Sequence, residues 1–435
     1  MSDNGKKIGL ITSISLVVGN MIGAGVFLLP ATLAKYGSIS LLGWLFTAAG
    51  ALILAKIFSN FSTIIVNKSG GPYTYSKAGF GDFIGFLVAW GYWISIWVSN
   101  AGLAIAIIGG LSVFFPILND SPFLSVTVAL GFIWFFTWIN SKGVKESGRI
   151  QVITTVLKLL PLIFIIIVGA FFFRLDNFPD FNLTGNGHFE TFPVVAALTL
   201  YAFLGVESAT IPAENVRNPE RNVPRATMIG TIITTLVYIL GTVVLFGLIP
   251  VAELSNSAAP FAEAGEIIGG EYGSYFVAFG AVISAVGCLN GWTLMVGQLP
   301  MAAAKDNMFP RIFKKENKNG VPIIGLIIGS LLTSGILLLG MSDGLVEQFS
   351  FVVNLTVLTA LIPYLFVSAA YVIVLIEKNK FPNSFLKTFL LGFLGVAYTI
   401  WAIFGSGSEV VFYGLILLLL SIPFYLLMKW NKSKM

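Results

Sequence analysis

Long apolar stretches recur along the whole chain, and they constrain its fold more than any other feature of the sequence. Each approaches the roughly 20 residues that a helix needs to cross a bilayer. They cover 8–34, 39–66, 83–115, 122–141, 150–173, 193–213, 225–250, 272–303, 321–341, 346–376, 385–406 and 408–428. Only 10% of the residues are charged, too few for the surface of a water-soluble protein. The sequence therefore predicts an all-α membrane protein with twelve transmembrane helices, and it excludes a soluble enzyme or a nucleic-acid-binding protein.

The positive charges in the loops predict the orientation of these helices. If the N-terminus is cytoplasmic, Lys35 and Arg174 are the only loop lysine or arginine on the outer side, and every other one lies on the cytoplasmic side. Lys and Arg are normally concentrated in cytoplasmic loops. We therefore expect a multi-pass protein of the cell inner (plasma) membrane with both termini in the cytoplasm.

Cysteine and histidine are almost absent. One cysteine, Cys288, cannot form an internal disulfide, and one histidine, His188, cannot build a histidine-based metal site. The sequence also lacks a metalloprotease motif and a Ser/His/Asp set. We expect neither a metal nor a cofactor, and no enzymatic activity.

Two of the spans contain sequences that an unbroken helix avoids. The first span carries three glycines between Gly19 and Gly25, and the sixth reads Tyr201–Ser208 with Gly205 inside it. Each glycine costs a helix about 1 kcal/mol relative to alanine, although glycine also serves close helix packing. The two breaks lie five spans apart, which predicts inverted repeats with a binding site at the midplane. Free N–H groups at the start of a half-helix suit a carboxylate, and carbonyls at the end of one suit an ammonium group. Such a site fits an α-amino acid.

These breaks and several other motifs resemble the amino acid–polyamine–organocation superfamily. The other motifs are Ser69–Tyr73 with Gly79-Phe80-Gly81, Asn218–Pro224, and Gly291-Trp292 with Gln298. Within the superfamily, the chain resembles the bacterial arginine/agmatine and basic amino acid/polyamine antiporters. The resemblance implies one transporter domain, 1–435, with a LeuT-like five-plus-five inverted repeat. Repeat one would cover 8–173, repeat two 193–376, and two peripheral helices 385–428. The peripheral helices are apolar enough to permit a homodimer.

The resemblance also implies the residues of a substrate site. The carboxylate-binding turn would comprise Asn20, Ile22, Ala24 and Gly25, and the carbonyls of Tyr201 and Leu204 would hold the amino group. Ser95, Asn100, Trp292 and Thr356 would line the remainder of the site. Tyr201 replaces a tryptophan that stacks on arginine in the antiporters, and tyrosine is the weaker cation–π partner. Tyr92 and Tyr364 would form the outer-side gate with Glu207.

Glu207 and Lys158 are ionisable residues deep inside spans, where a charge is expensive and indicates function. Glu207 follows the second break, and the resemblance implies that it couples site occupancy to gating; a structural hydrogen-bond anchor is the alternative. Lys158 lies in the fifth span, too far from its ends to reach the interface. Related transporters carry a lysine there in place of a sodium ion, bridging to the first span. Lys158 is then either a titratable coupling group or a permanently charged structural pin, and both argue against sodium coupling.

The expected function is an amino-acid exchanger of the arginine/agmatine type with broadened specificity, working by alternating access. Its partners would be an amino acid, its decarboxylated amine and the lipid bilayer. A proton-coupled symporter of broad or neutral specificity, using Lys158, is the alternative. A polyamine substrate is disfavoured because residues 74–77 contain no Asp or Glu, whereas the putrescine relatives carry an additional acidic residue in this region. A channel or receptor is a remote alternative, since no span carries a polar stripe.

Overall fold

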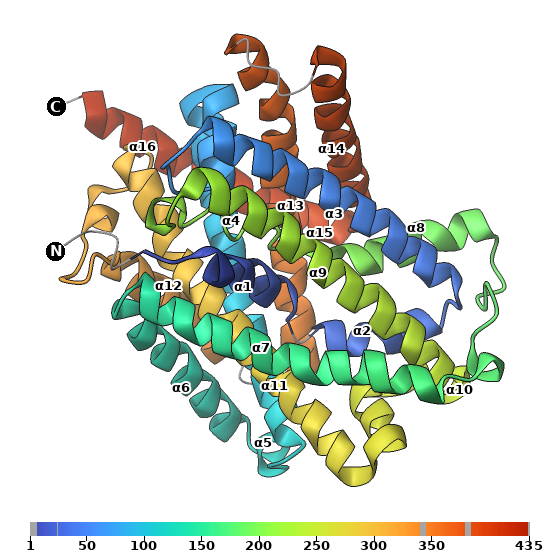
Figure 1. The fold of residues 1–435 in the computed structure, drawn as a ribbon. Coiled ribbons are helices and arrows are strands. Elements are labelled where there is room, and N and C mark those ends of the chain that lie inside the picture. Colours follow the sequence, from blue (N-terminus) through green and yellow to red (C-terminus); the bar gives the residue numbers. More distant parts are fainter. Residues whose placement is uncertain (1–6, 24, 340–344, 379–383, 434–435) are drawn as a thin grey trace.

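The computed structural model describes residues 7–23, 25–339, 345–378 and 384–433, and these residues form helices without a β-strand. Figure 1 shows their arrangement. The α-helices are α1 Leu10–Met21, α2 Gly25–Ala34, α3 Ile39–Ile64, α4 Pro72–Ser112, α5 Ile117–Asp120, α6 Pro122–Ser141, α7 Val144–Gly169, α8 His188–Leu200, α9 Pro219–Leu248, α10 Val251–Leu254, α11 Pro260–Lys305, α12 Ile323–Leu339, α13 Leu345–Glu377, α14 Phe385–Gly405, α15 Ser408–Leu419 and α16 Ser421–Ser433. The 3-10 helices are η2 Ala170–Phe172, η3 Leu175–Asn177, η4 Tyr201–Phe203, η5 Ala213–Asn215 and η6 Arg311–Lys314.

Most of the long helices satisfy the requirements for crossing a bilayer. Within the described residues, nine spans are long and apolar enough, or ten if the bent pair α1 and α2 is counted as one. The expected sixth and ninth spans are represented by shorter helices, α8 with 13 residues and α12 with 17. Large apolar side chains such as Phe389 and Leu427 are about half exposed on the outside of the bundle, as expected where lipid replaces water. The chain is an all-helical, multi-pass membrane protein.

The loops gather on two opposite faces of the bundle. On the face that we call the basic face, Ile8 bonds with Asn215 and Arg217, and Gly70 donates to the carbonyl of Ile211. On the other face, which we call the acidic face, the backbone of Ser38 and Ile39 donates to the carbonyls of Asp180 and Phe181. In Figure 1 the start of α1 and the helix α16 lie at the left, while α2 and α10 lie at the right. These contacts join loops that the predicted spans place on the same side of the membrane.

Two of the longest helices are bent at glycines near their starts. In α4, Gly81 has φ +77°, and in α11, Gly270 has φ +63°. A positive φ of this size is accessible to glycine at little cost. The predicted spans that begin at 83 and 272 therefore start just after the two bends, and a short preceding segment of each helix lies outside the predicted span.

Candidate functional site

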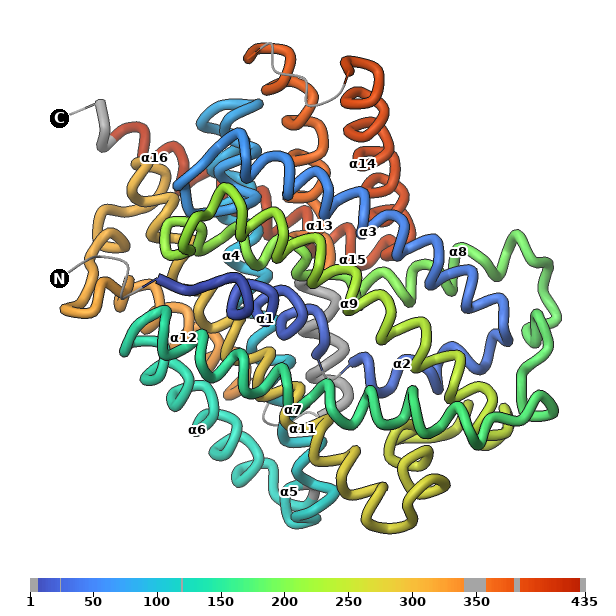
Figure 2. Tube along the Cα trace, in the orientation of Figure 1, coloured from blue at the N-terminus to red at the C-terminus, as the bar shows by residue number. Residues whose placement is uncertain are grey.

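Both predicted breaks interrupt their helices in the structure. The helix α1 ends at Met21 and α2 begins at Gly25, with a bend of 45° between them; Figure 2 shows them as separate helical segments. In the second break, α8 continues into η4, and the chain then turns at Gly205 with φ +106°. A Cβ at Gly205 would also lie 3.2 Å from the Trp292 ring, so glycine is required there for two reasons.

The segment after the second break differs from the expected half-helix. It forms successive turns up to Pro212 and then η5. Thr210 Oγ1 donates to the Glu207 carbonyl at 2.7 Å, and Ser208 Oγ accepts from Asn20 Nδ2 at 3.0 Å. Hydroxyl groups that bond to local backbone compete with helix formation. Glu207 therefore has no helix N-terminus beside it to stabilise its charge.

One tyrosine joins the two breaks. The Tyr238 hydroxyl, on α9, lies 2.8 Å from the carbonyl oxygen of Met21 and 3.0 Å from that of Ala202. These two carbonyls belong to different breaks. Tyr238 is buried, so both unwound segments are held at a fixed separation. This residue was not among the predicted site residues, because nothing in the sequence relates α9 to either break.

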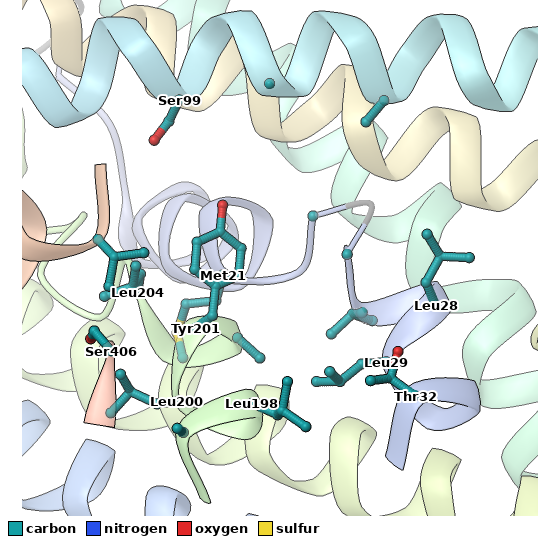
Figure 3. Close-up of a pocket in the computed structure, with 18 of the residues that line it drawn as sticks. Met21, Leu28, Leu29, Thr32, Ser99, Leu198, Leu200, Tyr201, Leu204 and Ser406 are labelled. Atoms are coloured by element: carbon teal, nitrogen blue, oxygen red, sulfur yellow. The ribbon is translucent and has the colours of Figure 1, made fainter. Parts of the chain in front are cut away.

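A cavity of about 680 Å³ opens between the two breaks, within the usual size of small-molecule sites. Its inner end is lined by Asn20, Tyr201, Leu204 and Trp292. Figure 3 shows Ser99 of α4 on one side of it and Leu198 and Leu200 of α8 on the other. Leu28 and Thr32 of α2 line its other end, towards the acidic face. The cavity therefore leads from the breaks to the acidic face.

The backbone at the cavity offers donors on one side and an acceptor on the other. Gly25 and Val26 line the cavity and open α2, and the first N–H groups of a helix have no partner within the helix. At the second break Leu204 has extended φ/ψ and lines the cavity, and no described donor bonds its carbonyl. The Tyr201 carbonyl accepts from the Leu204 N–H at 3.3 Å. Leu204 is therefore the better acceptor for a substrate amino group.

The Lys158 side chain is fully buried against the first break. Its ammonium Nζ donates to the carbonyl oxygens of Gly19 at 3.0 Å, Ile22 at 2.6 Å and Ser284 at 3.0 Å. An ammonium has three protons to donate, so its hydrogen bonding is complete. The carbonyls ending α1 do bind an ammonium group, as their chemistry suggested, but that group is Lys158. A substrate amine must bind elsewhere.

Glu207 is fully buried between two tyrosines. One carboxylate oxygen accepts from the Tyr92 hydroxyl and the other from the Tyr364 hydroxyl. Tyr364 also accepts from the Gly205 N–H at 3.1 Å. None of these three side chains is among the described residues that line the cavity, and their role as a gate stays a prediction. They connect the second break to α4 and α13.

The residues expected from the third span are displaced from the cavity. Ser95 is buried and donates to the Tyr92 carbonyl at 2.8 Å, and Asn100 is buried with an unpartnered Oδ1; neither lines the cavity. The cavity is lined on α4 by Ser99, Leu103 and Ala106 instead. These residues lie on the same helix face as Ser95, one to three turns further along the helix.

The eighth span contributes two side chains to the cavity. Cys288, which was not predicted at the site, lines the cavity and donates to the Asn20 carbonyl at 3.3 Å. Trp292 Nε1, which was predicted there, donates to the same carbonyl at 3.3 Å. Ser99 lies four residues after the predicted Ser95, and Cys288 lies four residues before the predicted Trp292. Each could have been predicted only by following the helix face of its neighbour by one further turn. Two other predicted positions, Ala24 and the side chain of Thr356, lie outside the described residues.

The chain has relatives over nearly its whole length. The family model described as "Amino acid permease" matches residues 8–424. The putrescine transporter PotE of Haemophilus influenzae is 34% identical over 416 residues, which are 95% of this chain and 95% of that protein. PotE of Escherichia coli K12 is 34% identical over 422 residues, 96% of this chain and 95% of that protein. An arginine/agmatine antiporter of Chlamydia abortus is 32% identical over 446 residues, 98% of this chain and 90% of that protein.

Proposed function

Because the chain belongs to the amino acid permease family, we propose that it is a secondary active transporter that moves an α-amino acid across the membrane by alternating access. Membership makes it an amine or amino acid transporter and not an enzyme. The observation that carries the proposal is that both helix breaks meet at one cavity. Among the described residues, the backbone N–H groups of Gly25 and Val26 have no acceptor and the Leu204 carbonyl has no donor.

The substrate would bind by its two backbone charges. Its carboxylate would accept hydrogen bonds from the first N–H groups of α2, where the helix dipole favours an anion. Its ammonium group would donate to the Leu204 carbonyl. Asn20 also lines the cavity, but its Oδ1 is buried against Gly291 and its carbonyl accepts from Cys288 and Trp292, so the Leu204 carbonyl is the acceptor that remains. Hydrogen bonds to the carboxylate and ammonium groups recognise the zwitterion that all α-amino acids share, and they do not depend on the substrate's side chain.

We further propose the twelve-span, five-plus-five inverted repeat. The candidate spans, together with α12 and the interrupted α8, account for the twelve segments. The two breaks occupy the first and sixth of them. The glycine bends of α4 and α11 also correspond, because each comes after a short helical segment near the start of the third or eighth span. These pairs of matching irregularities support an inverted repeat with its site at the interface.

Alternating access requires the inner end of the site to be closed when the outer end is open. The cavity reaches the acidic face, while the basic face is held by side-chain contacts between its loops. Lys305 Nζ lies 3.2 Å from Glu214 and 3.6 Å from Glu316, and Asp306 accepts from Tyr73 at 2.7 Å. We propose that this arrangement is the outward-open state and that these contacts break when the inner side opens.

We propose exchange as the transport mode, in line with the relatives that are named antiporters. Proton symport is the second candidate, favoured by one observation: the buried Lys158 ammonium links α7, the first break and α11. Loss of a proton from this group would leave two N–H donors for three carbonyls and would remove the positive charge that strengthens these bonds. A neutral Lys158 would therefore hold the end of α1 less firmly.

Uptake into proteoliposomes distinguishes these modes. Vesicles preloaded with unlabelled amino acid should take up labelled amino acid, and empty vesicles should not. Accumulation in empty vesicles under an inward proton gradient, lost in Lys158→Ala, would instead establish symport. Proton-driven accumulation that persists in Lys158→Ala would remove Lys158 from the coupling mechanism. The absence of any saturable amino acid or amine uptake would contradict the transporter proposal itself.

A further inference from the structure

We propose that the site selects amino acids with uncharged, apolar side chains over arginine, agmatine and putrescine. The inference rests on the proposed function and adds the chemistry of the substrate side chain. It departs from the substrates in the names of the relatives, and from the arginine/agmatine specificity expected from the sequence. Three features of the described residues carry it: a fixed positive charge, the placement of acids, and an apolar lining.

The fixed charge is the Lys158 ammonium. It bonds the carbonyls of Gly19 and Ile22, and the intervening Asn20 and Met21 line the cavity. No described carboxylate lies within ion-pair distance of it. The charge is therefore solvated by backbone carbonyls and is not cancelled by a carboxylate among the described residues. It attracts a substrate carboxylate but repels any positive charge beyond the amino group, and this repulsion is strong because the surroundings are apolar.

Acidic side chains are missing where a cationic substrate would need them. None of the described residues that line the cavity is Asp or Glu. The buried acid near the second break, Glu207, has both oxygens occupied by the hydroxyls of Tyr92 and Tyr364, and it does not line the cavity. A guanidinium or a second ammonium would thus be buried with no carboxylate of the described cavity lining in contact with it, which is unfavourable.

The space available to a substrate side chain is mostly apolar. On α4 it is bounded by Leu103 and Ala106, beside Ser99, and across from them by Leu198, Leu200 and Leu204. Figure 3 shows the three labelled leucines of α8 and the second break together on one side of the cavity. Burial of an aliphatic side chain here is favoured by the hydrophobic effect, while a charged one gains nothing from these contacts.

Two aromatic residues offer the cavity some attraction for a cation. Tyr201 is 37% exposed and lines the cavity, and Trp292 lines it as well. A cation–π contact lowers the energy of a buried cation but does not supply a counter-charge. Trp292 is also held by its bond to the Asn20 carbonyl. The aromatic rings therefore do not reverse the preference set by Lys158.

The test is competition for uptake in proteoliposomes and, independently, ligand-induced stabilisation of the purified full-length protein. The panel comprises L-leucine, L-alanine, L-arginine, agmatine and putrescine. We expect leucine or alanine to compete at least tenfold better than arginine, and agmatine and putrescine not to compete. In an Ala106→Asp variant, competition by arginine or agmatine should increase at least tenfold relative to competition by leucine. Ala106→Asn introduces a side chain of the same shape as aspartate but without its charge, and it should show no such increase.

The possible failures are separable. Preference of the wild-type protein for arginine, agmatine or putrescine would overturn this inference and leave the transporter proposal intact. Equal gains in Ala106→Asp and Ala106→Asn would overturn the electrostatic argument, because the charge would then be irrelevant. If no member of the panel is transported and none stabilises the protein, both the inference and the proposed function are wrong.

Discussion

Glu207 is the residue whose contacts most directly connect the second break to the rest of the bundle. Replacement by glutamine keeps its shape but leaves one oxygen to accept two tyrosine hydroxyls, from Tyr92 and Tyr364. A lost hydrogen bond to a buried charged group costs about 1.5–3 kcal/mol. We expect Glu207→Gln to reduce transport about tenfold or more in proteoliposomes while the protein remains folded.

The matched control for this variant lies on the exposed surface. Glu271 also accepts from a tyrosine hydroxyl, that of Tyr275 at 2.9 Å, but this pair is exposed. Glu271→Gln should transport as the wild type does. Similar rates in Glu207→Gln and the wild type would mean that Glu207 does not act in gating.

Lys158 stabilises the first break through three carbonyls. Without its ammonium, the oxygens of Gly19, Ile22 and Ser284 lose a buried donor. We expect Lys158→Ala to lower stability by on the order of 3 kcal/mol, seen as a lower thermal unfolding midpoint in detergent. Lys56, the other lysine within a span, is exposed, so Lys56→Ala should leave the midpoint unchanged. Equal midpoints for all three proteins would contradict a structural role for Lys158.

At the scale of single residues, the sequence identified the unusual groups but not their partners. An in-span lysine or glutamate stands out because burying a charge is expensive. The bond from Lys158 to Gly19, however, crosses 139 positions of the chain, and local spacing says nothing about such a contact. Asn100 was assigned to the site by the resemblance, yet it is buried and is not among the described residues that line the cavity, whereas Ser99 and Leu103 are.

Helices α1 and α7 approach so closely that a glycine is needed between them. A Cβ at Gly19 would overlap Gln151 Nε2 and would lie 2.9 Å from Thr155 Oγ1. Both groups also bond the Ser15 carbonyl, so they cannot move freely. Overpacking of this kind costs about 1–3 kcal/mol. We expect Gly19→Ala to lower the unfolding midpoint and reduce transport.

Gly9 provides the comparison, since nothing lies within 4 Å of a Cβ added there. It precedes the same helix, α1. Gly9→Ala should therefore retain the wild-type midpoint and rate. If Gly19→Ala and Gly9→Ala have the same unfolding midpoint and transport rate, then the close approach of α1 and α7 does not require a glycine at position 19.

At the scale of elements, glycine predicted where helices break but not the conformation of the chain beyond each break. The break between α1 and α2 and the bends at Gly81 and Gly270 all coincide with glycines or predicted span ends. The turns after Gly205 were missed because hydroxyls at Ser208 and Thr210 find bonds across the fold and along the backbone. Those bonds depend on tertiary packing, which hydropathy does not report.

Contacts across the basic face make the molecule sensitive to acid. Burial raises the pKa of Asp306, but the hydrogen bond from Tyr73 and the charge of Lys77 outweigh it, so the pKa lies below the ordinary value of 3.8. A depressed carboxylate pKa stabilises the folded state above pH 3.8 and loses that contribution as pH falls through the folded pKa. We expect Asp306→Asn to have a lower unfolding midpoint than the wild type at pH 7. The gap should narrow below pH 3.8, and a gap that is constant with pH would show that the charge of Asp306 is not involved.

The orientation of the whole molecule in the membrane is determined by the charge of its two faces. Lys315 is exposed on a loop of the basic face, and Asp180 is exposed on a loop of the acidic face. Basic loops stay in the cytoplasm, and the cavity would then open outwards. In a Cys288→Ser background, an impermeant maleimide added to intact cells should label Asp180→Cys at once. Lys315→Cys should react only after the cells are permeabilised. The reverse pattern would place the basic face outside, and the cavity would then be the inward-open site of a chain inserted against its charge distribution.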